Sequence, residues 1–460
     1  MSDAFAMTLD EIAQGIGARL VGAGANINGV STDSRSLQPG DLFVAIQGDN
    51  FDGHDYLPLA LQRGAVAALV SRPAPAVGLP QLVVDNTRFG YGRLARLWRS
   101  RFSPLTLALT GSNGKTTVKE MLRSILIRHA GGDALVLATE GNLNNDIGLP
   151  QMMLRLRARH RYAVFEMGMN HLGEIEYLSR LLEPDAAMVI MAGTAHIGEL
   201  GSREAIAQAK GEIFAGLKPG GTAVINMHDR FGAYWRGLVR EQSADTEILG
   251  FGISPEDEVV GTLGHEFMSI AFDGESVAVR LMVPGEHNQR NALAAAAGAI
   301  ALGVPLEVIR AGLESFTGVA GRLVACSGHN SATIVDDTYN ANPDSVKAAI
   351  KVLAASKPPR LLVLGDMGEL GAGAAAMHRE VGEFARRHGI ERLYAMGELS
   401  RETVAAFGSD AAHFDSHDAL VAALLPQLAP QTTVLVKGSR FMRMERVVEK
   451  LVPDYHGGHH

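Results

Sequence analysis

The sequence predicts an α/β protein of three domains, and both its length and its pattern indicate this. The 460 residues match the size of about three domains. Short apolar runs alternate with stretches of helical spacing, which predicts parallel sheets with helices on their faces. Turn-forming residues interrupt the pattern at Ser103-Pro104 and at Thr317-Gly318. We therefore expect a small N-terminal α/β domain (residues 1–103), a central parallel-sheet domain (104–317) and a C-terminal Rossmann-like domain (318–460).

The composition argues against several classes of protein. Hydrophobic residues make up 47% of the chain and charged residues 20%, as in soluble globular proteins. The net charge of −8 argues against a nucleic-acid partner, which would need a basic face. No apolar run reaches the roughly 18 residues of a membrane span, and no charged-then-apolar leader opens the chain. Cys326 is the single cysteine, so no intrachain disulfide can form and the cytoplasm is the expected location.

The N-terminal domain is predicted to open with an amphipathic helix and to continue with strands. Apolar residues at helical spacing predict the helix, namely Leu9, Ile12, Ala13 and Ile16. Strands are predicted over residues 42–46, 65–70 and 81–84, and a second helix over residues 88–101. Polar turns on both sides of the first strand contain Ser34, Arg35, Gly53 and His54. Such side chains can hold a ligand with hydroxyls and phosphates, and the Arg35 guanidinium suits a diphosphate. Ordinary turn chemistry is the alternative, and the residues alone favour it.

A glycine-rich loop lies between a predicted strand at 105–109 and a predicted helix, which is the setting of a phosphate-binding loop. Its sequence, TGSNGKTT, comprises Thr110, Gly111, Ser112, Asn113, Gly114, Lys115, Thr116 and Thr117. The glycines let the backbone approach phosphate oxygens, the lysine supplies positive charge, and a threonine hydroxyl can hold Mg²⁺. Leu109 stands where the longer form of the motif has glycine, so this is the compact G-x-x-G-K-T form.

Residues at the ends of the central strands are candidates for metal binding, because ligands lie outside the carboxyl ends of parallel strands. Glu166 follows a strand at 162–165, where its carboxylate could reach a metal held by the nucleotide. His196 lies in the loop after a strand at 186–191, and ligand and structural roles are equally compatible with that position.

Three further positions are open to more than one interpretation. Lys210 lies on a helix predicted over residues 202–217, where exposure to solvent is the usual state of a lysine. The loop GNLNNDIGLP includes Asn142 and Asn145, and its amides suit peptide or sugar recognition or simply form a polar loop. Asn288 and Asn291 begin an alanine-rich helix, where they could pair with an adenine edge or cap the helix.

The C-terminal domain is predicted to hold a second ligand at the end of its sheet. Strands at 333–335, 360–364 and 434–436 each end in a polar, glycine-bearing loop, and right-handed crossovers bring those loops to one edge. Lys437 and Arg440 could hold a substrate carboxylate there. The groups that could hold an amine or a peptide are Asn340, Asn342 and Asp366. A helix over residues 441–452 is predicted to close the chain.

Taken together, these motifs resemble the Mur ligase family over essentially the whole chain. TGSNGKTT alone would equally suit a folylpolyglutamate synthase. The more specific motifs are DSR…PGDLFVAI…DGHD, GNLNNDIGLP, AKGEIF, HNQRNALAAAA, DDTYNANPDS, GDMGELG and VKGSR. In one of them, Gly368 follows Met367 where the family more often has a bulkier residue.

The resemblance implies an ATP- and Mg²⁺-dependent ligase that adds D-alanyl-D-alanine to UDP-N-acetylmuramoyl-tripeptide through an acyl phosphate. The three domains would bind the UDP-linked substrate, ATP and the dipeptide, in that order along the chain. Thr116 would hold one metal ion and Glu166 and His196 another. Lys210 would be carbamylated, because CO₂ turns its amine into a carboxylate-like group that can orient a metal.

The resemblance also implies the remaining contacts. The residues that would contact ATP are those of the phosphate loop together with Asn288, Asn291, Arg322 and Asp337. The residues that would contact the UDP-substrate are Ser34, Arg35, Gly53, His54, Asn142 and Asn145. The residues that would contact the dipeptide are Asn340, Asn342, Asp366, Lys437 and Arg440. We expect the protein to act as a monomer. Two alternatives remain at this point: a related ligase acting on folate or on a shorter muropeptide, and a phosphate-loop ATPase coupled to a partner.

Overall fold

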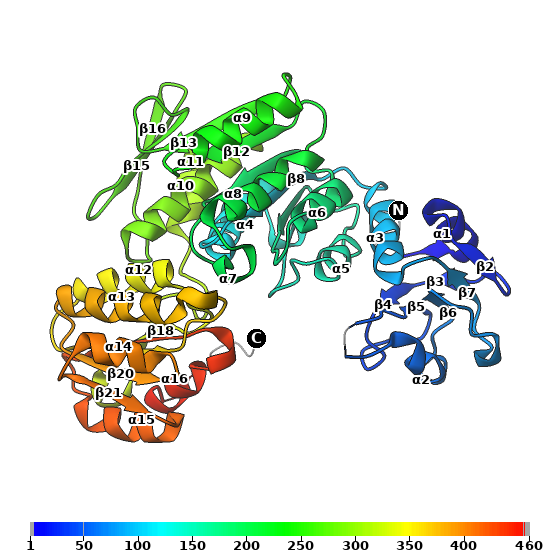
Figure 1. The fold of residues 1–460 in the computed structure, drawn as a ribbon. Coiled ribbons are helices and arrows are strands. Elements are labelled where there is room, and N and C mark those ends of the chain that lie inside the picture. Colours follow the sequence, from blue (N-terminus) through cyan, green and yellow to red (C-terminus); the bar gives the residue numbers. More distant parts are fainter. Residues whose placement is uncertain (1–3, 49, 454, 456–460) are drawn as a thin grey trace.

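The computed structural model describes residues 4–48, 50–453 and 455, and three lobes follow one another along the chain (Figure 1). The N-terminal lobe runs from β1 to α3, the central lobe from β8 to α11 and the C-terminal lobe from β17 to α16. The bounds of these elements are β1 Met7–Thr8, α3 Thr87–Arg99, β8 Leu105–Thr110, α11 Leu306–Glu314, β17 Val324–Ser327 and α16 Glu445–Leu451. Each lobe has a sheet of its own, so each can present one sheet edge to a ligand.

The N-terminal lobe has a five-stranded sheet in its described residues, in the order β2-β7-β6-β5-β4. The strands are β2 Arg19–Val21, β7 Gln81–Val83, β6 Ala67–Val70, β5 Asp41–Val44 and β4 Gly29–Ser31, and only β2 pairs antiparallel to its neighbour. Helix α1 (Leu9–Ile16) has the predicted bounds, because the Thr8 hydroxyl caps its start and Gly17 ends it with φ +67°. The three predicted strands are confirmed to within two residues at each end.

The central lobe has a nine-stranded sheet in the order β16-β15-β14-β13-β12-β11-β8-β10-β9. Besides β8, its strands are β9 Val136–Ala138, β10 Tyr162–Glu166, β11 Ala186–Val189, β12 Thr222–Asn226, β13 Glu247–Gly252, β14 Val259–Thr262, β15 Met268–Phe272 and β16 Glu275–Val279. The strands from β14 to β9 form the predicted parallel sheet, and an antiparallel hairpin that was not predicted extends it at one end, where β15 runs antiparallel to both β14 and β16. Asp273-Gly274, both with positive φ, form the two-residue turn of this hairpin, and Asp-Gly is a hairpin signal.

The long helix predicted over residues 202–217 is interrupted. Helix α8 spans Arg203–Gly211 and a 3₁₀ turn follows over Glu212–Gly216. At the end of that turn the chain passes close to α6 (Glu174–Leu182), since a Cβ at Gly216 would lie 2.1 Å from the Ser179 carbonyl carbon. Close contact with the neighbouring helix therefore outweighs the helical preference of the sequence.

The C-terminal lobe has a six-stranded sheet in the order β17-β18-β22-β19-β20-β21, parallel except for β17. Its parallel strands are β18 Thr333–Asp337, β19 Arg360–Gly365, β20 Arg392–Met396, β21 Ala411–Phe414 and β22 Thr433–Lys437. Strand β18 thus continues through Asp337, two residues beyond the predicted end. The last helix, α16, begins at Glu445 rather than at 441, because Arg443 adopts φ +50° after a short 3₁₀ turn.

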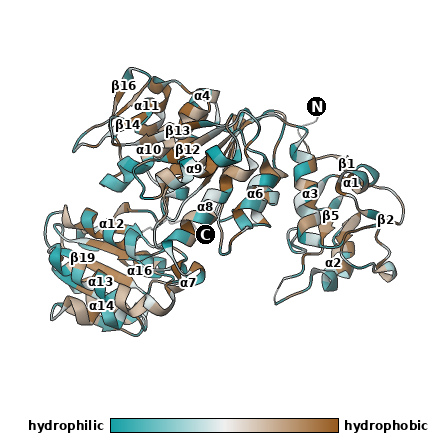
Figure 2. Cartoon of the chain, turned by 45° about the horizontal axis from the view of Figure 1, so that its top comes forward, coloured by the Kyte–Doolittle hydropathy of each residue, from teal (hydrophilic) through white to brown (hydrophobic). Residues whose placement is uncertain are grey.

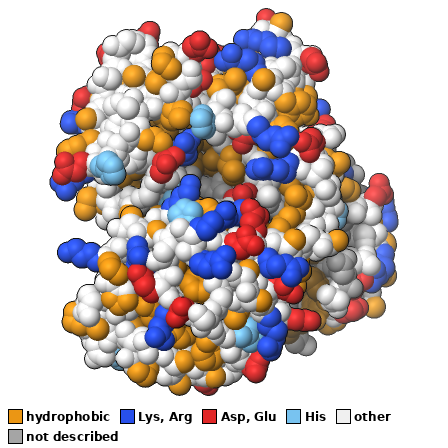
Figure 3. Space-filling model, turned by 60° about the vertical axis from the view of Figure 1, so that its left-hand side comes forward, with side chains coloured by type: hydrophobic (Ala, Val, Ile, Leu, Met, Phe, Trp, Pro, Cys, Tyr) orange, Lys and Arg blue, Asp and Glu red, His pale blue; other side chains and the backbone are white. Residues whose placement is uncertain are grey.

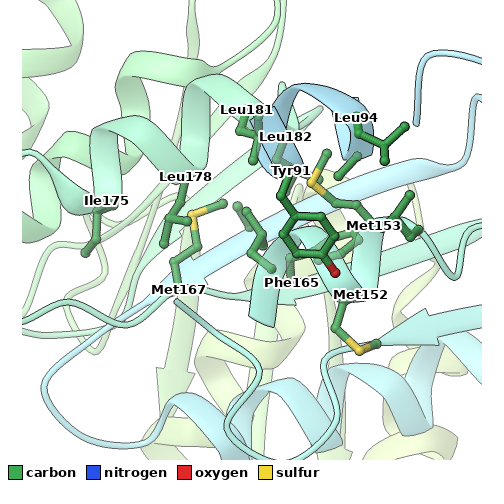
Figure 4. Packing of buried hydrophobic residues seen from close by; sticks show 14 of the residues in the cluster. Tyr91, Leu94, Met152, Met153, Phe165, Met167, Ile175, Leu178, Leu181 and Leu182 are labelled. Atoms are coloured by element: carbon green, nitrogen blue, oxygen red, sulfur yellow. The ribbon is translucent and has the colours of Figure 1, made fainter. Parts of the chain in front are cut away.

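Residues of high hydropathy concentrate on the strands and along parts of the helices (Figure 2). One core continues from the N-terminal lobe into the central lobe, because α3 packs on both. Tyr91 and Leu94 of α3 meet Met153 of α5 (Gly148–Met153), Phe165 of β10 and Leu181 of α6 (Figure 4). This shared core attaches the first lobe to the face of the central sheet opposite the phosphate-loop helix α4 (Lys115–Ala130). No helix in the described part of the chain is both long and apolar enough to cross a bilayer.

Candidate active site

The phosphate loop joins β8 to α4 and is packed too tightly for side chains at its glycines. Gly114 has φ +82°, and a Cβ there would lie 2.5 Å from Asn291 Oδ1. A Cβ at Gly111 would lie 3.0 Å from Ile190 Cβ. Thr110 ends β8, and its hydroxyl donates to the Met167 carbonyl at 2.8 Å, which ties the loop to the end of β10. The loop is therefore held between β11, β10 and the helix that carries Asn291.

Lys115 begins α4, and its Nζ donates to the Gly111 carbonyl at 2.8 Å, across the loop. Burial lowers the pKa of this lysine, while the Glu166 carboxylate opposes the shift. The charged form of this ammonium is stabilised by any anion that binds in the loop. The arrangement suits a phosphate oxygen as the next partner of the ammonium.

Glu166, at the end of β10, is held from three sides. Thr116 Oγ1 donates to its Oε2 at 3.2 Å, and Asn144 Nδ2 donates to its Oε1 at 2.9 Å. The Glu166 backbone N–H donates to the Thr139 hydroxyl at 2.9 Å. Asn142 and Asn145 of the GNLNNDIG motif were predicted to contact the UDP-linked substrate, whereas Asn144 of the same motif was not among the predicted site residues.

A hydroxyl and a carboxylate oxygen beside a phosphate loop are donors that Mg²⁺ prefers, so Thr116 and Glu166 fit this ion. Thr116 Oγ1 also receives a hydrogen bond from Arg322 Nη2 at 3.4 Å. Among the residues that the structure describes, no three or more His, Cys, Asp or Glu side chains form a metal cluster. The oxygen pair of Thr116 and Glu166 is thus the part of the predicted metal set that lies together in this structure.

His196 and Lys210 lie in different settings. His196, with φ +64°, places Nδ1 2.9 Å from Glu369 Oε2 of the C-terminal lobe, and the same cavity is lined by His196 and Glu166. The His196 ring at this distance lowers the pKa of Glu369. Lys210 is only 2% exposed, so it is not the solvent-facing lysine of the alternative interpretation. Burial, together with the charge of Lys115, holds the pKa of Lys210 well below its ordinary value.

Two adjoining cavities open beside the phosphate loop, between the central and C-terminal lobes. One, of about 540 Å³, is lined by Lys115, Thr116, Glu166, His196, Asn340 and Arg440, among others. The other, of about 350 Å³, is lined by Asn113, Asn288, Asn291, Arg322, Asp337 and Lys437, among others. Along the face drawn in Figure 3, charged side chains of both signs gather at the furrow between the upper, central lobe and the lower, C-terminal lobe.

Asn288 and Asn291 lie on the first turns of α10 (Glu286–Ala301) and face each other. Asn288 Nδ2 donates to the Pro284 carbonyl at 2.7 Å, and Asn291 Nδ2 donates to Asn288 Oδ1 at 3.3 Å. Neither side chain is the N-cap of the helix, which is Gly285. Both amides border the smaller cavity, where a planar base could meet them.

Lys437 and Asp337 form a buried ion pair of 2.7 Å across neighbouring strands β22 and β18. Burial raises the pKa of Asp337 and lowers that of Lys437. Lys437 Nζ also donates to the Asn340 carbonyl at 2.8 Å. The lysine that the sequence argument assigned to a substrate carboxylate is thus already paired, on the side of the smaller cavity.

The other predicted dipeptide residues divide into two groups. Asn340, Asn342 and Arg440 line the larger cavity. Both carboxylate oxygens of Asp366 accept backbone N–H groups, Oδ1 from Ser400 at 2.7 Å and Oδ2 from Leu399 at 3.2 Å. Asn342 caps α12 (Pro343–Ala354), and its Nδ2 donates to Asn113 Oδ1 of the phosphate loop at 2.8 Å.

The predicted UDP-substrate residues lie in the N-terminal lobe and in the loop before α5. Arg35 is 85% exposed and pairs with Asp33 at 2.8 Å, while Ser34 is buried. His54 is buried, with Nδ1 2.6 Å from Asp52 and Nε2 accepting from the Ser71 N–H at 3.0 Å. Both ring nitrogens are therefore engaged within the lobe.

Two of the remaining predicted residues, Gly53 and Asn145, have a role in the backbone structure of their own segments. A Cβ at Gly53 would lie 2.7 Å from the Ala45 carbonyl carbon, so glycine is required for close packing. Asn145 Oδ1 accepts the Gly148 N–H at 2.8 Å at the start of α5, while Asn142 is exposed. Asn145 is exposed as well, so both side chains face solvent.

A phosphate loop, an oxygen pair suited to Mg²⁺ and a Rossmann-like lobe across the cavity define a nucleotide-dependent enzyme. Family models match three successive segments: "Mur ligase family, catalytic domain" over residues 26–98, "Mur ligase middle domain" over 109–299 and "Mur ligase, glutamate ligase domain" over 321–440. The UDP-N-acetylmuramoyl-tripeptide--D-alanyl-D-alanine ligase of Escherichia coli (strain K12) is 41% identical over 455 residues, which are 97% of this chain and 98% of that protein.

Solved structures agree with this. MurF from Acinetobacter baumannii superposes with a TM-score of 0.90 at 36% identity, over 98% of this chain and 99% of that one. The MurF ligase from Thermotoga maritima in complex with ADP superposes with a TM-score of 0.80 at 27% identity, over 92% and 96% of the two chains. The chain belongs to the Mur ligase family.

Proposed function

We propose that this protein is the ATP-dependent ligase that joins D-alanyl-D-alanine to UDP-N-acetylmuramoyl-tripeptide in the synthesis of peptidoglycan precursors. The observation that carries this proposal is the full-length identity to the E. coli ligase, 41% over 97% of the chain. The phosphate loop with Lys115, Thr116 and Glu166 supplies the matching chemistry. We assign the UDP-substrate to residues 1–103, ATP to residues 104–317 and the dipeptide to residues 318–460.

The reaction runs through an acyl phosphate. A carboxylate oxygen of the tripeptide attacks the γ-phosphorus of ATP, the bond from that phosphorus to its bridging oxygen breaks, and ADP leaves. The amine of D-alanyl-D-alanine then attacks the activated carbonyl carbon, the C–O bond to phosphate breaks, and the amine gives up a proton. Both steps crowd negative charge together, which the protein has to offset.

Lys115 and the N–H groups at the start of α4 meet that demand. The Lys115 ammonium donates to the Gly111 carbonyl at 2.8 Å, and a phosphate oxygen is a stronger acceptor than this neutral group. Thr116 and Glu166 would hold Mg²⁺, which supplies positive charge to the phosphates when it is bound. Closure of the lobes would exclude water, which otherwise hydrolyses the acyl phosphate.

Lys210 is proposed to carry a carbamate. Its burial and lowered pKa favour the uncharged amine, which is the form that adds CO₂ with release of a proton. The product is an anion that can orient a metal ion together with His196. Mass analysis of the intact protein at neutral pH should show an extra mass equal to CO₂, and an unmodified, dispensable Lys210 would contradict the assignment.

We place the enzyme in the cytoplasm as a monomer. ATP and a nucleotide-linked precursor are cytoplasmic compounds, and the lone Cys326 suits a reducing compartment. Sedimentation of the purified protein tests the monomer.

Phosphate release tests the proposed function directly. We expect release only when UDP-N-acetylmuramoyl-tripeptide and D-alanyl-D-alanine are both present, with a product mass equal to the joined peptide. Single amino acids in place of the dipeptide should not support release. ATP consumption without formation of an amide would overturn the proposal.

The variant Lys115→Ala separates chemistry from substrate binding. Loss of the ammonium should reduce ligation by at least about 10²-fold, because charge that develops on the phosphates is no longer offset. Binding of the UDP-substrate, measured by calorimetry, should remain near that of the parent protein. Turnover that survives in Lys115→Ala would show that the ATP site is assigned to the wrong residues.

A further inference from the structure

Lys119 is a buried lysine on α4 that the proposed reaction does not use. Its side chain is 2% exposed and lies one turn beyond the phosphate loop. Nζ donates to the Thr139 carbonyl at 2.5 Å and lies 2.7 Å from Glu120 Oε1. A buried ammonium is costly to the fold unless it is paired, so this position calls for a reason beyond packing.

Thr139 connects this lysine to Glu166. It follows β9, and its N–H donates to the Val164 carbonyl of β10 at 3.0 Å. Its carbonyl accepts from Lys119, while its hydroxyl accepts the Glu166 N–H at 2.9 Å. All the polar groups of one buried residue are therefore used to join α4 to the end of β10.

The position of β9 explains why such a tether is useful. β9 has three residues and stands at the edge of the nine-stranded sheet, where β10 is its one partner strand among the described residues. The chain then leaves the sheet toward Asn144, whose amide donates to Glu166 Oε1 at 2.9 Å. An edge strand has no second neighbour to hold its end, and the Lys119 ammonium takes the place of that neighbour.

We propose that Lys119 is a positioning residue, which fixes the end of β9 so that Thr139 and Asn144 hold the Glu166 carboxylate against Thr116. This inference rests on the proposed function, because the role of Glu166 toward Mg²⁺ belongs to it. The residues that orient a metal ligand commonly change metal affinity by about 10–100-fold when they are removed. Lys119 acts on Glu166 indirectly, because Thr139 lies between the two and hydrogen-bonds to both.

The test compares Lys119→Met, Lys119→Arg and Thr139→Val with the parent protein. Each is measured for the Mg²⁺ concentration that half-saturates phosphate release, for Mn²⁺ binding to the ADP complex by electron paramagnetic resonance, and for thermal stability. Lys218→Met is the matched control, since Lys218 is a partly buried lysine of the central lobe that pairs with Asp185 at 2.6 Å.

We expect Lys119→Met and Thr139→Val each to raise the Mg²⁺ requirement by about 10-fold and to weaken Mn²⁺ binding by a similar factor. The double variant should be no worse than either single change, because both act through one tether. Lys119→Arg should retain most of the affinity, and Lys218→Met should change neither measure of metal binding. Should Lys119→Met fail to fold, Thr139→Val carries the same test with the loss of a single hydroxyl.

The variant Glu166→Gln distinguishes a failure of the inference about Lys119 from a failure of the metal-binding role proposed for Glu166. If Lys119→Met and Thr139→Val only lower thermal stability while Glu166→Gln changes metal binding, the inference about Lys119 is overturned alone. If Glu166→Gln itself leaves both metal measurements at the parent values, the metal role proposed for Glu166 falls, and the inference falls with it.

Discussion

Among the single residues near the phosphate loop, buried ionisable groups stand out. Lys115 and Lys210 are both shifted toward the neutral amine by burial, and the charge of Lys115 adds to the shift at Lys210. Lys437 is buried together with Asp337, and the two side chains form an ion pair of 2.7 Å. Of the three, Lys115 lies in the phosphate loop, and its ammonium is poorly solvated, so an incoming polyphosphate gains more from it than from a lysine at a solvated surface.

His287 gives this region a dependence on pH. The ring is partly buried beside the smaller cavity, and burial, helped by the charge of Lys437, lowers its pKa to about 4. Below about pH 6.5 the unfolded chain binds a proton that the folded ring does not, so this group makes the free energy of unfolding fall as pH drops toward about 4. In the variant His287→Gln, the free energy of unfolding should therefore fall less between about pH 7.5 and about pH 4, by up to about 3 kcal/mol. Urea unfolding at the two pH values measures this difference.

The control for this pH experiment is His171→Gln. His171 is exposed, and its hydrogen bond with Glu174 raises its pKa, so its contribution has the opposite sign. Equal acid sensitivity of His287→Gln and the parent protein would show that the ring is protonated in the folded state.

At the scale of elements, the phosphate-loop helix depends on a close helix–helix contact. α4 packs against α10 and α11, and a Cβ at Gly312 of α11 would lie 2.5 Å from the Ile125 Cα of α4. Ser124 Oγ also donates to the Gly312 carbonyl at 2.9 Å. These contacts set how closely α11 can approach the helix whose start forms the anion site.

Gly312→Ala is expected to destabilise the protein by about 1–3 kcal/mol, because the new methyl group meets backbone atoms that can move only with the whole helix. Gly237→Ala is the matched control, since Gly237 lies on α9 (Gly232–Gln242) with open space at its Cβ. That change should be neutral or stabilising by up to about 1 kcal/mol. Denaturant unfolding gives the free energy of unfolding of both variants. Equal values would contradict the proposed close packing at Gly312.

On the scale of the whole molecule, the two lobe junctions differ in kind. The N-terminal lobe joins the central lobe through the apolar core around α3. The C-terminal lobe joins it through polar contacts of the site itself, Asn342 with Asn113, Asp344 with Thr194 and Glu369 with His196. Ile197 of the central lobe adds an apolar contact with the C-terminal core. Loops that would touch the ligands also hold the lobes together, so ligand binding and lobe docking are physically linked.

Asp344→Ala tests that link. Asp344 Oδ2 accepts both the N–H and the hydroxyl of Thr194 at 2.9 Å, and their loss should free the loop before α7 (Ile197–Leu200). We expect faster amide hydrogen exchange over residues 192–200 and a KM for ATP raised by several fold, roughly the effect of one lost charged hydrogen bond. The control is Glu380→Ala, whose partner Lys347 belongs to the same lobe. Unchanged exchange in Asp344→Ala would contradict the proposed role of this contact.

Local features of the fold were predictable because neighbouring residues specify them. The capped helix α1, the strand–loop–helix of the phosphate site and the polar loops after the C-terminal strands follow from apolar spacing and turn residues. The antiparallel hairpin was missed, although Asp273-Gly274 signals it, because the alternation of strands and helices elsewhere suggested a uniform pattern. The break after Gly211 was not predictable, because it depends on a neighbouring helix.

By itself, the sequence determined the three-part α/β architecture, the phosphate loop and the family, because these depend on residues close together in the chain. Only the tertiary structure decided which side chains meet. It placed Asn144 rather than Asn142 or Asn145 on Glu166, joined Lys437 to Asp337, and brought Asn342 to Asn113, 229 positions away. Such pairs form when strands and lobes pack, and packing depends on the shape and burial of the whole molecule rather than on local spacing.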